Sequence, residues 1–105
     1  MADKNELLAL LSRHIGEAAG ITAEQITLAI GVPKRRVRTM VSELRLDGVA
    51  VCGHPRDGYY IAASAEEIEK TCKFLRARSL HSLLLESRLR GVPLEDLVGQ
   101  MRLPT

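Results

Sequence analysis

Apolar residues recur every three or four positions near the start of the chain, and this spacing is typical of an amphipathic helix. It predicts a helix over residues 4–15, whose inward stripe consists of Leu7, Leu8, Leu11 and Ile15. Two glycines, Gly16 and Gly20, then interrupt the pattern. Since glycine breaks helical periodicity, the residues between them are predicted to form a connector.

A second helix is predicted to begin after Thr22, because Gln25 follows three residues later and completes a capping-box pattern. The helix should continue to Ile30, and Gly31 suits the left-handed conformation in which many helices end. The residues expected to face inward are Ile26, Ala29 and Ile30.

A third helix is predicted over residues 33–46, with Pro33 at its first position, where a missing N–H costs nothing. Gly48 is expected to end it. The apolar face of this helix should consist of Val37, Met40, Val41 and Leu44. The opposite face is therefore expected to point to solvent.

The next segment predicts a β-hairpin. Residues 49–51 are short and rich in valine, as a strand is, and residues 59–62 can return as its partner. Between them, residues 54–58 combine proline with Asp-Gly, which favours a turn. The tip of the hairpin should carry His54, Arg56 and Asp57.

Two further helices are predicted after the hairpin. Ser64 and Glu67 form a second capping-box pattern, which begins a helix over residues 65–90 that is about 40 Å long at ~1.5 Å per residue. Its first half should carry an inward stripe of Ile68, Cys72 and Leu75. Gly91 is expected to end this helix, and Pro93 to open a last short one that runs through Met101.

These elements predict an α+β fold that is mostly helical. Residues 1–63 should form a three-helix core with a β-hairpin, and residues 64–105 a long C-terminal helical extension. The chain has 105 residues, one Phe, two Tyr and no Trp, so the core must be aliphatic. A chain of this length supports one small domain.

Positive charge is concentrated in the third helix. Residues 34–45 hold five basic residues and one acidic residue, although the whole chain carries a net charge of only +2. A local basic patch favours a directed contact with a polyanion, whereas a basic face that is merely solvated is the alternative. The candidate contacts in a DNA groove are Arg35, Arg38, Thr39 and Ser42. The candidate phosphate contacts are Lys34, Arg36, Arg45 and Arg56.

The same region resembles the winged helix-turn-helix domain at the amino terminus of the biotin repressor family. The resemblance covers residues 7–61, and its most specific part is the step from Leu44 through Gly48-Val49 into the Gly58-Tyr59 return. It implies a three-helix core with a β-wing, DNA contact through the third helix, and phosphate or minor-groove contact from the wing. The biotin-binding and ligase functions of that family are not implied, and the length of the chain looks more like that of small phage or prophage regulators.

Leucine is dense near the end of the chain, beyond what a three-helix core can cover. The candidate interface consists of Leu80, Leu83, Leu84, Leu94, Leu97, Val98 and Met101. It predicts a homodimer, which would suit a palindromic DNA site. Two alternatives are a last helix folded back on its neighbour in a monomer, and a docking surface for a different protein.

Motifs for catalysis are not found. The chain has no Gly-rich phosphate loop, no His-Glu-x-x-His run and no Cys–His pairing near a plausible cleft, so we expect no enzyme, no metal, no cofactor and no small-molecule substrate. No window has the roughly 20 apolar residues of a membrane span, and no signal-peptide core is seen at the amino terminus. Cys52 and Cys72 are expected to be reduced thiols in the cytoplasm.

The sequence therefore predicts a sequence-specific protein that binds double-stranded DNA, a transcriptional regulator acting as a homodimer. The alternative is a winged-helix module for protein–protein interaction, such as a phage or replication accessory, that does not bind DNA.

Overall fold

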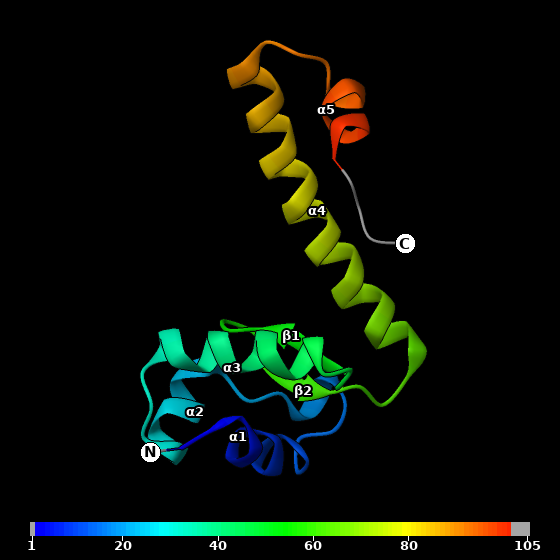
Figure 1. Cartoon of the computed structure of the whole chain (residues 1–105). Helices are drawn as coiled ribbons and strands as arrows, with labels where there is room; N and C mark the ends of the chain where they lie inside the picture. Colours follow the sequence, from blue (N-terminus) through cyan, green and yellow to red (C-terminus); the bar gives the residue numbers. More distant parts are fainter. Residues whose placement is uncertain (1, 102–105) are drawn as a thin grey trace. The chain divides into compact units, whose positions relative to one another are not determined.

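The computed structural model describes residues 2–101 and has an α+β fold that is mostly helical, as predicted (Figure 1). Its elements are α1 (Lys4–Leu11), the 3-10 helix η1 (Glu17–Ala19), α2 (Ala23–Ile30), α3 (Lys34–Leu46), β1 (Val51–His54), β2 (Gly58–Ile61), α4 (Ala65–Arg90) and α5 (Leu94–Gln100). The chain divides into two compact units between Thr71 and Cys72. This boundary lies inside α4, not before it, because the first turns of α4 bond to the preceding elements.

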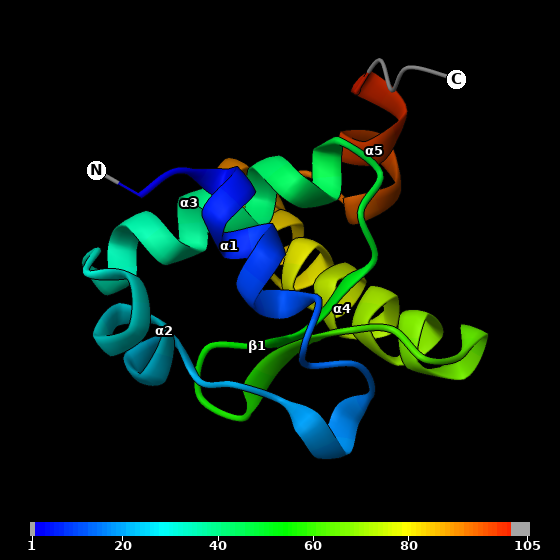
Figure 2. The same ribbon diagram turned by 90° about the horizontal axis from the view of Figure 1, so that it is seen from below.

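The core of the first unit lies between α1, α2 and α3, which pack against one another (Figure 2). The apolar face predicted for α3 is confirmed, since its four members are at most 2% exposed. The innermost side chains of the three helices are Leu7, Leu11, Ile26, Val37, Met40, Val41 and Leu44. Burying such side chains contributes about 1.5–3 kcal/mol each to the free energy of folding. This packing holds the outer face of α3 rigidly toward solvent.

The first helix is shorter than predicted. It ends at Leu11, and Ile15, expected in its inward stripe, is 57% exposed and forms an isolated parallel bridge with Ile61. The amide of Gly16 donates to the carbonyl of Ile61, and the amide of Ile61 donates to the carbonyl of His14. Because the backbone of this segment completes the outer edge of β2, it cannot also continue the helix.

The predicted start and end of α2 are confirmed. The Thr22 hydroxyl accepts from the Gln25 amide at 3.2 Å, and the Gln25 side-chain oxygen accepts from the Thr22 amide at 2.9 Å. Gly31 ends α2 in the left-handed conformation, with φ of 72°. Pro33 is the N-cap of α3, so that helix begins one residue later than predicted.

One predicted inward residue of α2 is wrong. Ala29 is exposed, and Ala23, with 2% of its surface exposed, takes its place beside the fully buried Ile26. Successive residues lie about 100° apart around a helix. Ala23 and Ile30 therefore lie on the same side of Ile26, and Ala29 lies on its other side, at the solvent margin.

The hairpin is confirmed, with its strands placed differently from the prediction. The first strand is Val51–His54, not residues 49–51, and pairs antiparallel with Gly58–Ile61 in a register that opposes Cys52 and Tyr60. The amide of Val49 donates to the carbonyl of Leu44 at the end of α3, which keeps this residue in the turn. The outer edge of β2 pairs through Tyr59 with Ile21.

The start of α4 is fixed by its side chains. The Ser64 hydroxyl accepts from the Glu67 amide at 3.3 Å, and the Glu67 carboxylate accepts from the amides of Ala63 at 2.7 Å and Glu17 at 2.8 Å. These backbone hydrogen bonds lower the pKa of Glu67. Lys70 pairs with the Glu17 carboxylate at 2.6 Å, a hydrogen bond that raises the pKa of Lys70.

The inward stripe predicted for the first half of α4 is wrong. Ile68 and Leu75 are 41% and 38% exposed, and Cys72 is exposed as well. The buried residue is Thr71, whose hydroxyl accepts from the Gly53 amide at 3.1 Å. Burial also raises the pKa of Tyr60, which its hydrogen bond with Thr71 opposes. A polar residue can be buried here because its hydroxyl satisfies a backbone amide of β1.

The second unit holds the rest of α4, followed by α5. The Ser87 hydroxyl donates to the carbonyl of Val92 at 2.6 Å across the turn, in which Gly91 has a φ of 68°. Pro93 is the N-cap of α5, and Leu97 is its buried residue, 4% exposed. None of the helices within residues 2–101 has the length and apolar character needed to cross a membrane.

Candidate nucleic-acid interface

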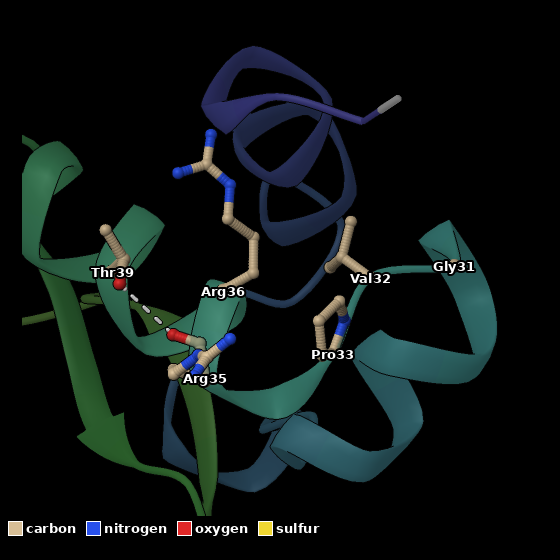
Figure 3. A pocket seen from close by; sticks show the side chains of 6 residues that line it. All are labelled: Gly31, Val32, Pro33, Arg35, Arg36 and Thr39. Carbon is tan, nitrogen blue, oxygen red and sulfur yellow. Dashed lines mark hydrogen bonds between the residues drawn. The ribbon is translucent and has the colours of Figure 1, made fainter.

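The outer face of α3 presents polar and basic side chains away from the core. The four predicted groove contacts, Arg35, Arg38, Thr39 and Ser42, are all exposed. The Thr39 hydroxyl donates to the carbonyl of Arg35 at 3.2 Å within the helix (Figure 3). Its proton is therefore used locally, and the oxygen can serve as an acceptor for a ligand.

One surface depression lies where α2 turns into α3, and we call it the turn depression. It is lined by Gly31, Val32, Pro33, Arg35, Arg36 and Thr39 (Figure 3). The guanidinium groups of Arg35 and Arg36 leave the helix in different directions (Figure 3). Arg36 lies 3.7 Å from the Glu43 carboxylate, so only Arg35 offers an uncompensated charge to this depression.

A second depression joins the start of α3 to the hairpin, and we call it the tip depression. It is lined by Thr22, Ala23, Glu24, Lys34, Arg38, Pro55 and Arg56. Lys34 and Arg38 are four residues apart and share one side of the helix. The amide of Ala23 donates to the carbonyl of Pro55 at 3.1 Å, which holds the hairpin tip against the start of α2. Three cations from two elements therefore face the same concave surface.

Ion pairing separates the basic residues of the first unit into two groups. Lys4 pairs with Asp47 at 2.7 Å, and Arg36 and Lys70 also have carboxylate partners. Within residues 2–101, Arg13 has no such partner but lines neither depression, and the side chains of Lys34, Arg35, Arg38 and Arg56 have none either. These four, which we call the open cations, line the two depressions. Glu24 is the acid that shares the tip depression with them.

Arg45, predicted to contact phosphate, is engaged within the protein. Its Nε donates to the carbonyl of Val51 at 2.8 Å, and one terminal nitrogen donates to the carbonyl of Gly53 at 3.0 Å. The side chain is half-buried between α3 and β1. The sequence did not predict this contact, because helical spacing shows only that Arg45 lies on a flank of α3. The structure shows that β1 runs back along that flank.

The histidine of the hairpin also has a local partner. His54 Nε2 lies 2.9 Å from an Asp57 carboxylate oxygen, so both predicted tip residues face each other within the turn. Arg56, between them in sequence, is exposed. The tip therefore presents a single cation outward on a turn that its own side chains brace.

The residues of the predicted apolar interface differ in how far they are exposed in the second unit. Leu80, Leu84, Val98 and Met101 are 38–47% exposed, and Leu83 and Leu94 are half-buried. Leu97 is buried and is not available to a partner, which corrects its assignment. Two leucines outside the predicted set are more exposed than its members, namely Leu85 at 52% and Leu89 at 89%. Both lie in the leucine-rich stretch of the sequence, and only the structure shows that they are its most exposed members.

Other site residues missed by the sequence come from outside the basic helix. Thr22, Glu24 and Pro55 line the tip depression, although the sequence indicated Thr22 only as a cap and Pro55 only as a turn residue. Nothing local in the sequence places the start of α2 beside the hairpin tip. In the part of the chain that the structure describes, no three His, Cys, Asp or Glu side chains gather into a group that could hold a metal ion.

Comparison with known proteins gives no match: no family model, no curated protein and no solved structure is similar to this chain at a significant level.

Proposed function

We propose that this protein is a sequence-specific, double-stranded DNA-binding protein with a winged helix-turn-helix layout. In this proposal α2 and α3 are the helix-turn-helix, α3 is the recognition helix, and the β1–β2 hairpin is the wing. The observation that carries the proposal is the gathering of the open cations in two adjoining depressions while the neighbouring cations are paired. Uncompensated charge on a rigid helix is available to a polyanion without first breaking an ion pair.

The depressions suggest which contacts position the protein and which read sequence. Lys34, Arg38 and Arg56 line the tip depression together and are assigned to DNA phosphates. Arg38 thus moves from the groove set to the phosphate set. Arg35 lines the turn depression and is assigned to a base edge, where Arg can bond in a bidentate way to guanine. Thr39 and Ser42 continue this exposed face along α3.

Affinity for DNA of mixed sequence tests the phosphate contacts. Fluorescence anisotropy would be measured on a duplex at several salt concentrations between 50 and 200 mM. In Arg35→Ala/Arg38→Ala we expect the magnitude of the salt slope to fall by about 0.9, the contribution of the one phosphate contact, Arg38, that this variant removes. At ~0.1 M salt, one lost contact corresponds to a loss of roughly eightfold in affinity.

The matched control removes two arginines that lie elsewhere. Arg13 and Arg76 are exposed, and no acid pairs with either within residues 2–101. The variant Arg13→Ala/Arg76→Ala has the same net charge as the test variant, so it should keep the slope of the unmodified chain. Equal losses in the two variants would show general charge attraction and would refute the proposed interface.

We further propose that the regulator acts as a homodimer through the second unit. Leu84, Leu85 and Leu89 expose apolar surface along α4. Two copies related by a two-fold axis would place two α3 helices on half-sites about one helical turn of DNA apart. Selection of bound duplexes from a random pool should then return inverted repeats.

Light scattering tests the assembly separately from DNA binding. We expect a mass of twice 11.6 kDa at micromolar concentration, and the mass of one chain for Leu85→Lys/Leu89→Lys. Both side chains are exposed in the single chain, so this variant should keep the helical circular-dichroism signal of the unmodified chain. A single-chain mass for the unmodified protein would refute the dimer and leave DNA binding by one chain intact.

The second candidate function is a protein-interaction module that does not bind DNA. The exposed leucines of the second unit favour it, because large apolar patches mark interaction surfaces. Absence of binding to duplex DNA at 50 mM salt would support this function over the first.

A further inference from the structure

The carbonyl edge of β1 that faces away from β2 is covered by one side chain. In the antiparallel pair, alternate residues of a strand direct their backbone groups outward. The outward carbonyls of Val51 and Gly53 are the ones that Arg45 contacts, at 2.8 and 3.0 Å. An edge strand without such a partner would leave these carbonyls to water or to another chain.

The same strand is held from a second side. The amide of Gly53 donates to the Thr71 hydroxyl at 3.1 Å, and Thr71 is 8% exposed. Gly53 is therefore fixed through its carbonyl by α3 and through its amide by the first turns of α4. It lies directly opposite Tyr59 and one residue before the pair that closes the turn, at the base of the hairpin tip.

We propose that Arg45 is a positioning residue for DNA binding, which sets the hairpin tip, and so Arg56, at a fixed place relative to the basic face of α3. This inference rests on the proposed DNA-binding function. Arg45 is part of the recognition helix, and its two bonded carbonyls lie on the strand that leads into the tip. The guanidinium forms a rigid fork that can hold two carbonyls at once, which a lysine ammonium on a flexible stem does not match.

Arg45 thus acts through Arg56 and not on the DNA itself. The two roles give opposite results in Arg45→Lys, which keeps the positive charge. A phosphate contact survives in large part when arginine is replaced by lysine, since both side chains bind phosphate. A fork that holds two carbonyls is lost, and the tip is then free to move away from the DNA.

A double-variant cycle in duplex binding tests the proposal. We expect Arg45→Lys and Arg56→Ala each to reduce affinity at ~0.1 M salt by roughly eightfold and the salt slope by about one, the value of one phosphate contact. In the combined variant we expect no further loss beyond Arg56→Ala alone. Arg13→Lys, an exposed replacement of the same kind, is the control and should bind as the unmodified chain does.

A second variant, Thr71→Val, tests the same proposal without changing a charged side chain. This variant keeps the shape of the side chain and removes the hydroxyl that holds Gly53. We expect the same reduction in salt slope, and again no further loss in combination with Arg56→Ala. This arm also decides the proposal if Arg45→Lys does not fold, as judged by circular dichroism.

The outcomes are separable. If the losses in affinity from Arg45→Lys and Arg56→Ala multiply in the combined variant, the two residues make independent contacts and the positioning role is overturned. Unchanged binding by Arg45→Lys would also overturn it. Unmodified protein that fails to bind duplex DNA at 50 mM salt overturns the proposed function, and the role of Arg45 in DNA binding with it.

Discussion

Gly53 and Gly48 offer a test of how tightly the hairpin is built. Both have positive φ, 83° and 90°, where a residue with a Cβ is strained. Their surroundings differ. A Cβ on Gly48 would meet nothing within 4 Å, whereas a Cβ on Gly53 would lie 2.0 Å from the carbonyl oxygen of Gly58 across the hairpin. Alanine at the two positions therefore separates backbone strain from a steric clash.

The expected magnitudes follow from this difference. Gly48→Ala should cost about 1–2 kcal/mol, the strain of a left-handed residue with a side chain. Gly53→Ala carries the same strain and a contact 1.4 Å shorter than the 3.4 Å at which ordinary contact begins. Since the obstacle is backbone, β1 and β2 must separate. Each ladder hydrogen bond lost costs about a further 1 kcal/mol, so the total should exceed ~3 kcal/mol.

Urea unfolding followed by circular dichroism measures both variants against the unmodified chain. Hydrogen exchange locates the damage, and we expect faster exchange at the amides of Tyr60 and Ile21 in Gly53→Ala but not in Gly48→Ala. Equal losses of stability in the two variants would show that the hairpin opens freely at this point. The rigid placement of Arg56 would then be untenable.

Two further predictions concern the caps that fix α2 and α4. Thr22→Ala removes the hydroxyl that accepts from the Gln25 amide and should lower the free energy of unfolding by about 1 kcal/mol. The control, Ser42→Ala at an exposed position of α3, should change the free energy of unfolding little. Equal effects of the two variants in urea unfolding would refute the role of the cap. Glu67 has a pKa below its ordinary value of 4.5, so its ionised form stabilises the fold above that pH, and this stability is lost as pH falls through the lowered folded-state value. Glu67→Gln should therefore unfold more easily than the unmodified chain at pH 7, with a difference that shrinks below about pH 4.5 in thermal melts; a difference independent of pH would show that the charge plays no part.

The sequence was sufficient where bonding is local. The capping box of Thr22 and Gln25 and the left-handed Gly31 involve residues a few positions apart, so their pattern is legible without the fold. The buried face of α3 was likewise predicted, because a strong 3.6-residue period leaves one orientation for a helix on a core.

The local sequence pattern gave wrong predictions where contacts with a distant segment determine the structure. Helix α1 ends early because the backbone near Ile15 pairs with Ile61, a partner far along the chain. In α4, Ile68 is exposed and Thr71 is buried, the opposite of what their polarity predicts, because the Thr71 hydroxyl accepts a hydrogen bond from an amide of β1. Apolar periodicity carries no information on which backbone groups lack a partner.

The candidate interface divides in the same way. The sequence alone determined that α3 carries a basic face and that a turn with one arginine follows it. Only the tertiary structure decided which cations remain open, that Lys34 and Arg38 share a depression with Arg56, and that Arg45 braces β1 instead of facing outward. The physical reason is that charge and helical face are properties of neighbouring residues, whereas pairing and convergence depend on where the chain returns.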